Sequence, residues 1–554
     1  MRRKIAVLGL ATSLLVAVGV VGAGSSVADR GATLAPAAGI VPSWCKANVT
    51  RGRVTIKNDC MLSSGGRMFF DGPDTSGGES PKQAQPSFGS NKDAADPNED
   101  LASGQSETAI AASGQNIVAA WNDATGFITF PSAGKKASLT GVGWSGTGGA
   151  IWHDLVGLPN SNQAQKWFGD PTVVAIDSTH FVVGSLYLPA CFAVNVSCNG
   201  SKLELAVSVG TVPPSGPPTF TQPIIAANGG SIFSSTSGFL DKEFLSYDPV
   251  SRTLAMSYTD FRFDPPTNCG NGEIDLVRAT VPADPATLSS GDWSAPIVIG
   301  PEIGGDCSTF VEQEGAYPAV APGGDIYVAW ERNWFTNLGF NGDPYVYIDA
   351  AYLPSGSTTV ANTVVASVNQ PGATRLGGFK SLGSVAIAGY NRGLGNDFPR
   401  IAYNTALGQV DIAWNSGSLH PLGDIFVKAI APTLSNNASA PVYRVDDDNS
   451  FALHFLPGLS VRSDGSICTS WYDRRAHGAD SAVTDYWGEC RPNVSTNTAD
   501  FVITTGPTDW TNTSTFIFPN FGDYTDNASD GLTTYYLWSD GRVGVPNPFF
   551  DLHT

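Results

Sequence analysis

The stretch "FPNFGDYTDNASDGLTTYYLWSDGR" (518–542) decides the fold, because a similar stretch occurs about 350 residues earlier in the chain. There the sequence reads "KWFGDPTVVAIDSTHFVVGSLYL" (166–188). Both stretches contain Phe-Gly-Asp, an apolar run, a polar turn and a second apolar run with an aromatic residue at or near its end. Two strand-forming runs around a turn rich in Gly, Asp or Asn predict a β-hairpin.

The hairpin pattern occurs seven times along the chain. Its turns, such as "PGGD" (322–325), use residues that tolerate positive φ or stabilise tight turns. Each second strand closes on Trp or Tyr, and successive closing residues lie 57 to 84 positions apart. The seven units are 106–123, 169–188, 240–262, 314–332, 396–416, 454–475 and 521–542, and their closing residues are Trp121, Tyr187, Tyr258, Trp330, Trp414, Trp471 and Trp538.

Weaker strand candidates lie between the hairpins, for example "DWSAPIVIG" (292–300) and "YVYIDAAYL" (345–353). Two strong and two weaker strands per repeat predict an all-β fold, a single β-propeller of four-stranded blades. Seven hairpins predict seven blades, with six as the alternative if one unit is irregular. Only twelve residues follow Arg542, too few for two more full strands. We therefore expect an N-terminal strand, such as one within "GRMFFDGP" (66–73), to complete the last blade.

The N-terminal segment 1–28 has a basic start, an apolar run and small residues at Ser26-Val27-Ala28, which together predict a signal peptide. An N-terminal membrane anchor is the alternative. No later segment is apolar for long enough to span a bilayer. We expect a secreted, extracellular protein. Its predicted organisation is a signal peptide (1–28), an N-terminal extension and linker that can contribute a closing strand (29–98) and the propeller (99–554).

The chain is acidic, with a formal net charge of −19. Segment 1–28 holds three basic and no acidic residues, so the remainder carries −19 − 3 = −22. This charge disfavours nucleic acid or an anionic membrane surface as a partner. All eight cysteines lie after residue 28, and an even number in an exported chain predicts disulfides. The expected pairs join neighbours in the sequence: Cys45–Cys60, Cys191–Cys198, Cys269–Cys307 and Cys468–Cys490.

The repeats "YPAVAPGGDIYVAW", "FPRIAYNTALGQVDIAW", "SWYDRR" and "FGDY…LWSDGR" resemble those of the sialidase-like (neuraminidase-like) propeller superfamily, from about residue 99 to the end of the chain. The resemblance implies a propeller. For sialidases themselves it also implies an arginine triad that grips a carboxylate, a Tyr nucleophile assisted by Glu, and an Asp acid/base. The sequence departs from that pattern, because it contains no intact Ser-x-Asp-x-Gly-x-Thr-Trp box and no Arg-Ile-Pro.

Antiparallel pairing brings the start of each first strand and the end of each second strand to one face, around the central channel. Many carboxylates lie at these positions. Glycoside hydrolysis needs one protonated and one ionised carboxyl group, and crowding of like charges separates their pKa values. The candidate catalytic residues are Asp170, Asp241, Glu243, Glu314 and Asp523, and the candidate substrate-binding residues are Lys242, Tyr317, Arg400, His454, Arg474 and Tyr524.

Several of these patterns also have purely structural interpretations. The repeated Trp residues are expected to pack between blades, and "W-x-D-x-R" (538–542) to fix a turn and an inter-blade ion pair. Acidic residues at hairpin starts can cap loops, and His454 can be a structural histidine. No cofactor is required by the sequence, although oxygen ligands in "RVDDDNS" (444–450) could bind calcium, the alternative being a solvated acidic loop.

Three functional hypotheses follow from these observations. The first is a carbohydrate-active propeller, a monomer, that hydrolyses or otherwise processes a glycan or polysaccharide at the carboxylate-rich mouth of the channel. The second is a non-catalytic propeller that binds glycan or protein at the cell surface. The third, and least favoured, is a true sialidase. Two suitably spaced carboxylates favour the first hypothesis, carboxylates that are all satisfied by partners favour the second, and three clustered arginines favour the third.

Overall fold

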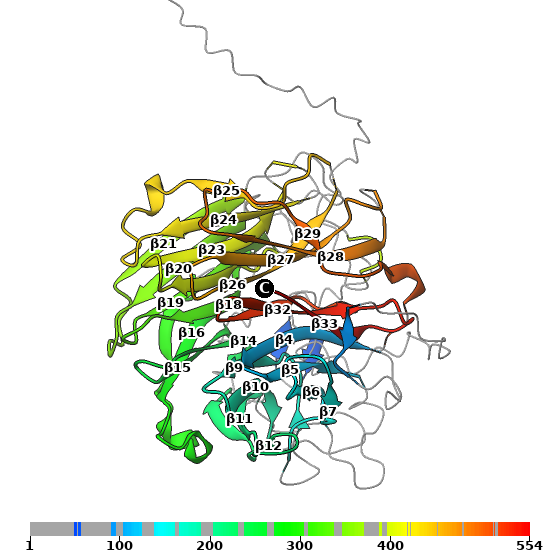
Figure 1. Ribbon diagram of the computed structural model, residues 1–554. Helices are drawn as coiled ribbons and strands as arrows, with labels where there is room; N and C mark the ends of the chain where they lie inside the picture. The colour runs from blue at the N-terminus through cyan, green and yellow to red at the C-terminus, as the bar shows by residue number, and fades with distance from the viewer. Residues whose placement is uncertain are drawn as a thin grey trace, which may run out of the picture. The chain divides into compact units, whose positions relative to one another are not determined.

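In the computed structural model, seven antiparallel sheets form a ring of seven propeller blades (Figure 1), which confirms the predicted all-β fold and the number of blades. We number the blades in chain order. The structure describes residues 49–51, 54–56, 90–95, 104–124, 138–160, 166–189, 203–230, 238–262, 271–303, 309–336, 346–369, 387–390, 396–417, 419–420, 423–450, 452–478, 481–513, 515 and 519–554.

The first four blades use strands from residues 105 to 369. Blade 1 contains β4 (Gln105–Ser113), β5 (Asn116–Asp123), β6 (Thr140–Ser145) and β7 (His153–Asp154). Blade 2 contains β8 (Lys166–Trp167), β9 (Thr172–Ala175), β10 (His180–Leu188), β11 (Glu204–Thr211), β12 (Thr219–Phe220) and β13 (Ile224–Ala227). Blade 3 contains β14 (Gly238–Asp248), β15 (Thr253–Arg262), β16 (Asn271–Thr280) and β17 (Ile297–Gly300). Blade 4 contains β18 (Thr309–Val320), β19 (Ile326–Thr336), β20 (Val346–Leu353) and β21 (Asn362–Asn369).

The remaining blades use the C-terminal part of the chain and one N-terminal strand. Blade 5 contains β22 (Arg400–Asn404), β23 (Gln409–Ser416), β24 (Asp424–Ile430) and β25 (Val442–Arg444). Blade 6 contains β26 (His454–Val461), β27 (Ile467–Asp473), β28 (Val483–Arg491), β29 (Phe501–Val502) and β30 (Thr508–Asp509). Blade 7 contains β31 (Asp526–Asp530), β32 (Thr533–Asp540), β33 (Asn547–His553) and β3 (Lys92–Asp93).

Few other elements occur among the described residues. A separate two-stranded hairpin is formed by β1 (Val49–Arg51) and β2 (Val54–Ile56). The helices in the described part of the chain are short 3-10 turns: η2 (Pro285–Thr287), η3 (Ser290–Asp292), η5 (Asn437–Ser439) and η6 (Trp510–Asn512). None of these helices is long and apolar enough to cross a membrane.

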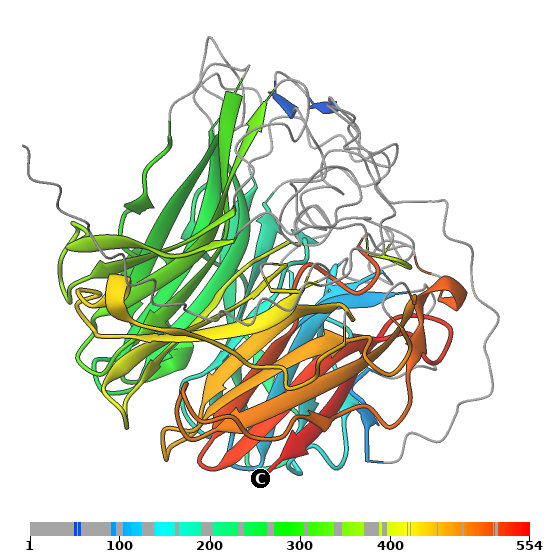
Figure 2. The same cartoon turned by 90° about the horizontal axis from the view of Figure 1, so that it is seen from above.

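The first strands of the blades contact one another around the centre of the ring. β4 contacts β9 and β31, β14 contacts β9 and β18, and β22 contacts β18 and β26, which in turn contacts β31. In Figure 1 the labels of several of these strands gather in the middle, and in Figure 2 the red strands of blade 7 lie beside the blue strands of blade 1. The start of each first strand therefore faces the axis.

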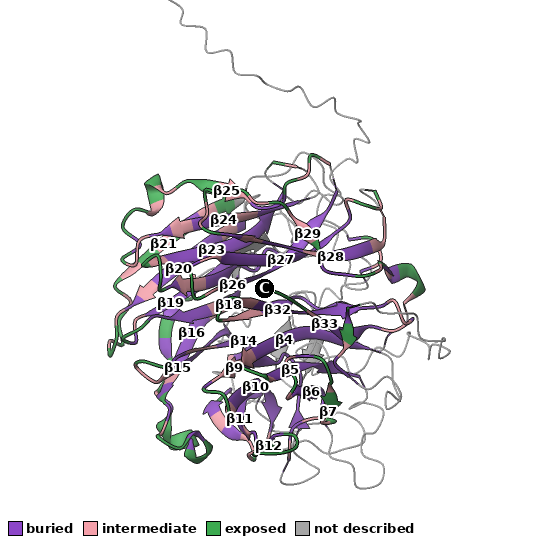
Figure 3. Ribbon diagram, in the orientation of Figure 1, coloured by how far each residue is buried: buried purple, intermediate pink, exposed green. Residues whose placement is uncertain are grey.

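Each hairpin buries its closing aromatic residue, and the strands are buried along most of their length (Figure 3). Trp121 of blade 1 packs with Tyr535, Leu537 and Phe550 of blade 7. Apolar contact between neighbouring blades is worth about 25 cal/mol per Å² of apolar surface removed from water. The interpretation of the repeated Trp as inter-blade packing is thus confirmed.

The "W-x-D-x-R" pattern acts within one turn. Trp538 Nε1 donates to Asp540 Oδ2 at 2.9 Å, and Arg542 Nε donates to Asp540 Oδ1 at 3.0 Å. The expected inter-blade ion pair is wrong for this motif, because Asp540 and Arg542 are two residues apart and close their own loop. Outside this loop, Arg542 Nη1 donates to Thr505 Oγ1 at 3.0 Å, and its guanidinium carbon lies 4.8 Å from the ring centroid of Phe549.

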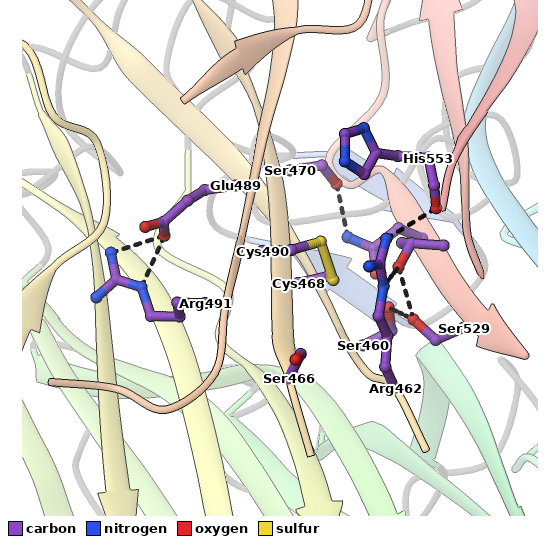
Figure 4. The surroundings of a disulfide bond; sticks show 12 residues. Ser460, Arg462, Ser466, Cys468, Ser470, Glu489, Cys490, Arg491, Ser529 and His553 are labelled. Carbon is purple, nitrogen blue, oxygen red and sulfur yellow. Dashed lines mark hydrogen bonds and ion pairs between the residues drawn. A yellow bond between two sulfur atoms is a disulfide. The ribbon is translucent and has the colours of Figure 1, made fainter. Parts of the chain in front are cut away.

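The disulfide between Cys468 and Cys490 joins directly opposed residues of β27 and β28 in blade 6 (Figure 4). This predicted pair is confirmed, and the other six cysteines lie outside the described residues. On the same blade, Arg462 Nη2 donates to the carbonyl of His553 at 2.8 Å and so ties blade 6 to blade 7. The disulfide fixes the register of β27 and β28, and the Arg462 contact ties the same blade to blade 7.

The ring closes by pairing the two ends of the described chain. Lys92 and Asp93 of β3 pair with Phe550 and Phe549 of β33. This strand lies within the predicted N-terminal extension, whereas the candidate 66–73 lies outside the described residues, as does segment 1–28. Blade 7 therefore combines three strands from the C-terminal end with one from the N-terminal side.

Asn91 anchors the closing strand. Its Nδ2 donates to the carbonyl of Ile503 at 2.9 Å and to Asp551 Oδ2 at 2.7 Å. Its Oδ1 accepts from the backbone N–H of Thr505 at 2.7 Å and from the hydroxyl of that residue at 2.9 Å. The buried Asn91 amide thus joins the N-terminal segment to Asp551 of blade 7. It also binds Ile503 and Thr505, which precede the C-terminal strands of blade 7 in the chain.

Replacing Asn91 by Ala should destabilise the protein. The change leaves buried partner groups unsatisfied, and we expect a loss of about 1–3 kcal/mol in the free energy of unfolding, measured by chemical denaturation. Lys92→Ala is the matched control, because the Lys92 side chain is exposed and its backbone pairing is retained. Equal stabilities of the two variants would contradict the anchoring role of Asn91.

Candidate functional site

Bulges shape the first strands where they approach the axis. The pairing register shifts after Ser106 in β4, after Asp241 in β14, after Glu314 in β18 and after Phe455 in β26. A bulge turns the strand locally and re-aims the side chains beside it. The shared position of these bulges explains why the polar residues at the hairpin starts converge.

Three charged residues occupy left-handed backbone conformations at this level: Glu107 and Asp170 at φ 54° and Lys242 at φ 55°. Blades 4 and 7 carry Gly315 and Gly522 with positive φ in the corresponding stretch. A residue with a Cβ in this region costs about 1–2 kcal/mol relative to an ordinary conformation. Leu456 has the same conformation (φ 54°) at the corresponding bulge of blade 6, so the left-handed conformation is a feature of this position in several blades.

These side chains form a buried group that we call the axial cluster. It draws on blades 1, 2, 3 and 7, and each member is at most 2% exposed. The members of the axial cluster are Glu107, Asp170, Lys242, Glu243, Asp523 and Tyr524.

The centre of the axial cluster is an ion pair between blades that are not neighbours. Lys242 Nζ of blade 3 donates to Asp523 Oδ2 of blade 7. The other carboxylate oxygen of Asp523 accepts from the Tyr390 hydroxyl at 2.8 Å, and its backbone carbonyl accepts from Asn396 Nδ2 at 3.0 Å. Asp523 thus holds together segments from three parts of the ring.

Glu107 lies beside Asp170 and is held by hydrogen bonds from two directions. Asn122 Nδ2 donates to Glu107 Oε2 at 2.6 Å, and the backbone N–H of Asp523 donates to Glu107 Oε1 at 3.2 Å. Asn122 Oδ1 accepts from the backbone N–H of Asp170 at 2.6 Å. Burial raises the pKa of Glu107 well above its ordinary value, and the negative charge of Asp170 adds to that rise, while Lys242 opposes it. These surroundings favour the protonated form of Glu107 next to Asp170.

Glu243 differs from the rest of the axial cluster in its hydrogen bonding. Its side chain is 1% exposed, and among the described residues neither carboxylate oxygen has a hydrogen-bond partner. Burial raises its pKa well above the ordinary value, with further contributions from the charges of Asp170 and Asp241. A raised pKa favours the neutral form of a buried carboxyl group, which can donate its proton.

Arg400 lies among aromatic rings at the edge of the axial cluster. Its guanidinium carbon is 5.0, 4.9 and 5.8 Å from the ring centroids of Phe244, Tyr317 and Tyr524. Its Nη1 donates to Pro399 O at 3.2 Å, and its Nη2 donates to the carbonyl of Thr525 at 3.3 Å. Three of the predicted binding residues, Tyr317, Arg400 and Tyr524, are thus brought together.

Two predicted carboxylates lie at bulges beside this group. Asp241 is fully buried, and its Oδ1 accepts from the backbone N–H of Lys242 at 3.0 Å. Glu314 is buried in β18, directly opposite Glu331 of β19. Tyr524, by contrast, is committed through its hydroxyl, which donates to the carbonyl of Pro171 at 3.1 Å.

Arg474 lies in blade 6 and contacts other groups. Its Nη2 donates to the carbonyl of Ala388 at 2.7 Å, and its guanidinium carbon is 5.4 Å from the ring centroid of Phe455. Burial lowers its pKa to about 9. The two arginines predicted for ligand binding, Arg400 and Arg474, therefore have separate surroundings.

His454 belongs to an acidic group between blades 5 and 6. Its Nδ1 is 2.9 Å from the carbonyl of Gly423, and its Nε2 is 3.4 Å from both Asp448 Oδ1 and Asp473 Oδ2. Burial alone would lower its pKa, but Asp473, Asp446 and Asp448 raise it above the ordinary value. The ring thus favours the imidazolium form, paired with carboxylates on both sides.

The described residues include two groups whose ligand atoms lie within 4.8 Å of one another and could hold a metal ion: Asp424, Asp446 and His454, and Asp260, Glu273 and Asp275. The first includes part of the "RVDDDNS" segment. Arg444 Nε lies 3.4 Å from Asp446 Oδ2, so a cation already accompanies that carboxylate. Calcium binding by this segment stays a prediction.

Sequence reasoning missed the residues that position the axial cluster. Asn122 follows the closing Trp121 and holds Glu107, and in blade 5 Asn415 follows Trp414 and donates to Asp397 Oδ1 at 2.6 Å. An Asn directly after the closing Trp, paired with an acidic residue near the start of the same hairpin, was the available signal. Tyr390 lies between hairpins, and Asn396 is the first residue of the unit 396–416.

Comparison of the sequence with protein-family models and with curated proteins found no match. Several solved structures align with the chain at low identity. A protein of unknown function from Dyadobacter fermentans is 12% identical with a TM-score of 0.39, covering 73% of this chain and 99% of its own. A Trypanosoma rangeli sialidase is 12% identical with a TM-score of 0.37, covering 69% of this chain and 54% of its own. An α-L-arabinofuranosidase of Fusarium graminearum is 9% identical with a TM-score of 0.40, covering 84% of this chain and 98% of its own.

Further sialidases are among the aligned structures, at 10–12% identity and a TM-score of 0.38. At these identities and TM-scores the alignments concern the fold. The chemistry of the site rests on its own residues.

Lys242→Met should destabilise the protein, because it leaves Asp523 buried without its cation. Breaking one side of a buried ion pair typically costs about 3–5 kcal/mol. The double variant Lys242→Met/Asp523→Asn removes both charges and should recover part of that loss, as measured by denaturant unfolding of the four proteins in the cycle. A double variant no more stable than Lys242→Met would show that the two charges are not coupled.

Asp526→Asn should change how stability depends on pH. Burial raises the pKa of Asp526 to about 7, although Arg400 lowers it, while an unfolded aspartate titrates near about 4. The stability contributed by protonated Asp526 is full below pH about 4 and is lost as the pH rises towards 7. The amide that replaces the Asp526 carboxyl group in the variant does not titrate. As the pH rises from about 4 to about 7, the free energy of unfolding of Asp526→Asn should therefore increase relative to that of the wild type by about 1–4 kcal/mol.

Urea unfolding at intervals of pH from 4.5 to 7.5 would measure this difference, at values chosen to bracket the titration. Asp284→Asn is the control, because Asp284 is exposed. A difference between Asp526→Asn and wild type that stays constant with pH would contradict the assignment.

Proposed function

We propose that the chain is an exported carbohydrate-active propeller that hydrolyses a glycan at the axial cluster. The observation that carries the proposal is Glu243, a buried carboxyl group whose pKa is raised by burial and whose oxygens have no hydrogen-bond partner in any other described residue. A structural carboxylate in a protein interior is normally satisfied by hydrogen bonds. A group that can donate its proton to a leaving oxygen has this unsatisfied state before substrate binds.

In the proposed reaction Glu243 acts as general acid and protonates the glycosidic oxygen of the leaving group. A second carboxylate must attack the sugar or activate water, and Asp170 is the candidate because its charge acts on Glu243. Loss of the Glu243 proton to the leaving oxygen leaves a carboxylate that can later accept a proton from water. Lys242 and Asp523 position the cluster through their ion pair.

The runner-up is a propeller that binds glycan or protein without catalysis. The state of Asp523 favours it, because that carboxylate is saturated by Lys242 and Tyr390. A true sialidase is least supported, since Arg400 and Arg474 contact different groups. Export is inferred from segment 1–28 alone.

The test is a product assay with the chain from Asp29 onward. It is incubated with a panel of polysaccharides and sialylated glycans, with and without chelator, and products are read by mass spectrometry. Glu243→Gln and Asp170→Asn should each reduce the rate of sugar release by about 10²–10⁴-fold, the range typical of lost acid–base catalysis. Asp411→Asn is the matched control, since Asp411 is a buried carboxyl in blade 5 that accepts from Asn404 and Gln409.

The pH profile gives an independent check. Because Glu243 must be protonated, the rate should fall as the pH rises through its raised pKa, and the surviving activity of Glu243→Gln should lack that limb. Product release that is unchanged in Glu243→Gln would refute its role as acid. No product from any substrate, with glycan binding retained, would favour the non-catalytic alternative.

A further inference from the structure

Lys242 and Asp523 bring a primary amine into direct contact with a carboxyl group inside the protein. Lys242 Nζ donates to Asp523 Oδ2, and both side chains are at most 1% exposed. The two residues are 281 positions apart in the chain, so the contact depends on the folded ring. An amine and a carboxyl group can condense to an amide with loss of water, and a fixed contact makes such a reaction effectively unimolecular.

Both partners are held in place by their backbones. Lys242 has a left-handed conformation (φ 55°), and its backbone N–H donates to Asp241 Oδ1 at 3.0 Å. The backbone carbonyl of Asp523 accepts from Asn396 Nδ2 at 3.0 Å, and its backbone N–H donates to Glu107 Oε1 at 3.2 Å. Because the backbone is anchored on each side of the contact, little conformational entropy is lost when the two groups react.

Burial favours the reactive forms of the two groups. In water both are charged: an ammonium nitrogen has no lone pair with which to attack, and a carboxylate resists attack. Burial removes the hydration that stabilises both charges. Lys242 Nζ lies 5.3 Å from the ring centroid of Phe398, and the ring of Tyr390 stacks on that of Phe521 at 4.1 Å. Transfer of one proton from Nζ to the carboxyl group in these aromatic surroundings gives a neutral amine beside a neutral acid.

From this geometry we propose that Lys242 and Asp523 become joined by an isopeptide bond. Nζ attacks the carboxyl carbon of Asp523, the bond between the nitrogen and that carbon forms, and the bond from the carbon to Oδ2 breaks. Oδ2 leaves as water with two of the three hydrogens of the ammonium group, so atoms and charge balance without an oxidant or a cofactor. Oδ1 stays as the amide oxygen, and the Tyr390 hydroxyl, which donates to it at 2.8 Å, stabilises the negative charge that develops there.

The ion pair is the state that precedes this bond. The bond links blade 3 to blade 7 covalently, and unlike the ion pair it persists when the chain is unfolded. This inference is independent of the proposed glycan-processing function, since the reaction needs no ligand.

Lys428 offers a comparison within the same protein. Its Nζ donates to Asn437 Oδ1 at 2.9 Å, so an amine again lies against a side-chain carbonyl group. Asn437 is only half-buried, and Lys428 Nζ also donates to the carbonyl of Ala366 at 2.9 Å. Solvent reaches this pair, and we expect no bond at Lys428.

The test is mass spectrometry of the reduced and denatured chain from Asp29 onward. Its intact mass should be lower than the sequence mass by one water molecule. Trypsin should fail to cleave after Lys242, because an acylated lysine carries no charge, and one branched peptide should contain both Lys242 and Asp523. On a denaturing gel the linked chain should migrate ahead of an unlinked variant, because the bond holds distant parts of the unfolded chain together.

Matched variants separate the bond from the ion pair. Lys242→Arg keeps the positive charge, but a guanidinium group stays protonated and does not attack a carboxyl group. The mass of Lys242→Arg should therefore equal its sequence mass, and so should that of Asp523→Ala. Lys428→Arg is the control and should retain the loss of one water.

A wild-type chain of unmodified mass that is cleaved after Lys242 would overturn the proposal. A loss of water that maps to other peptides, or that persists in Lys242→Arg, would overturn it as well. Because the mass and the peptides of the wild-type chain decide the matter, the result does not depend on whether a variant folds.

Discussion

The ion pair between Lys242 and Asp523 is the contact on which the centre of the molecule depends. It links blade 3 to blade 7 across the axis, although the two blades are not neighbours in the ring. An aromatic contact joins the same two blades, because the ring centroids of Phe244 and Tyr524 are 5.0 Å apart. Because Asp523 also receives Tyr390 and Glu107 lies against its backbone, the ion pair couples the geometry of several blades. The axial cluster thereby acquires a fixed shape.

The backbone supplies the other half of this arrangement. Charged residues in left-handed conformations at Glu107, Asp170 and Lys242 are sustained by the surrounding sheets, whose pairing continues on both sides of each bulge. Strand pairing and Trp packing make the sheets rigid. The bulges in these rigid strands set the direction of the polar side chains. Stability and site geometry thus come from different parts of the same strand.

The fold was predictable from sequence because its signal is repeated. Each hairpin repeats an apolar run, a polar turn and a second apolar run with its closing aromatic residue, and seven weak signals together exclude most alternatives. The axial cluster was predictable in part, since Asp170, Lys242, Glu243, Asp523 and Tyr524 lie at the hairpin starts that topology brings to the axis. What topology cannot supply is the partner of each group. Tyr390 lies outside the repeats. The hydrogen bonds of the axial cluster depend on backbone bulges, and these bulges produce no repeated pattern in the sequence.

The order in which the chain is made gives the closing strand a further significance. Asn91 and Asp551 are 460 positions apart and yet are directly hydrogen-bonded. A polypeptide that emerges N-terminus first must therefore carry the segment around Lys92 without its partner until nearly the whole chain exists. Pairing of such distant segments makes folding slow, since chain entropy opposes it until the end. Every molecule therefore passes through a stage in which the ring is still open, because the last strands of blade 7 are made long after β3.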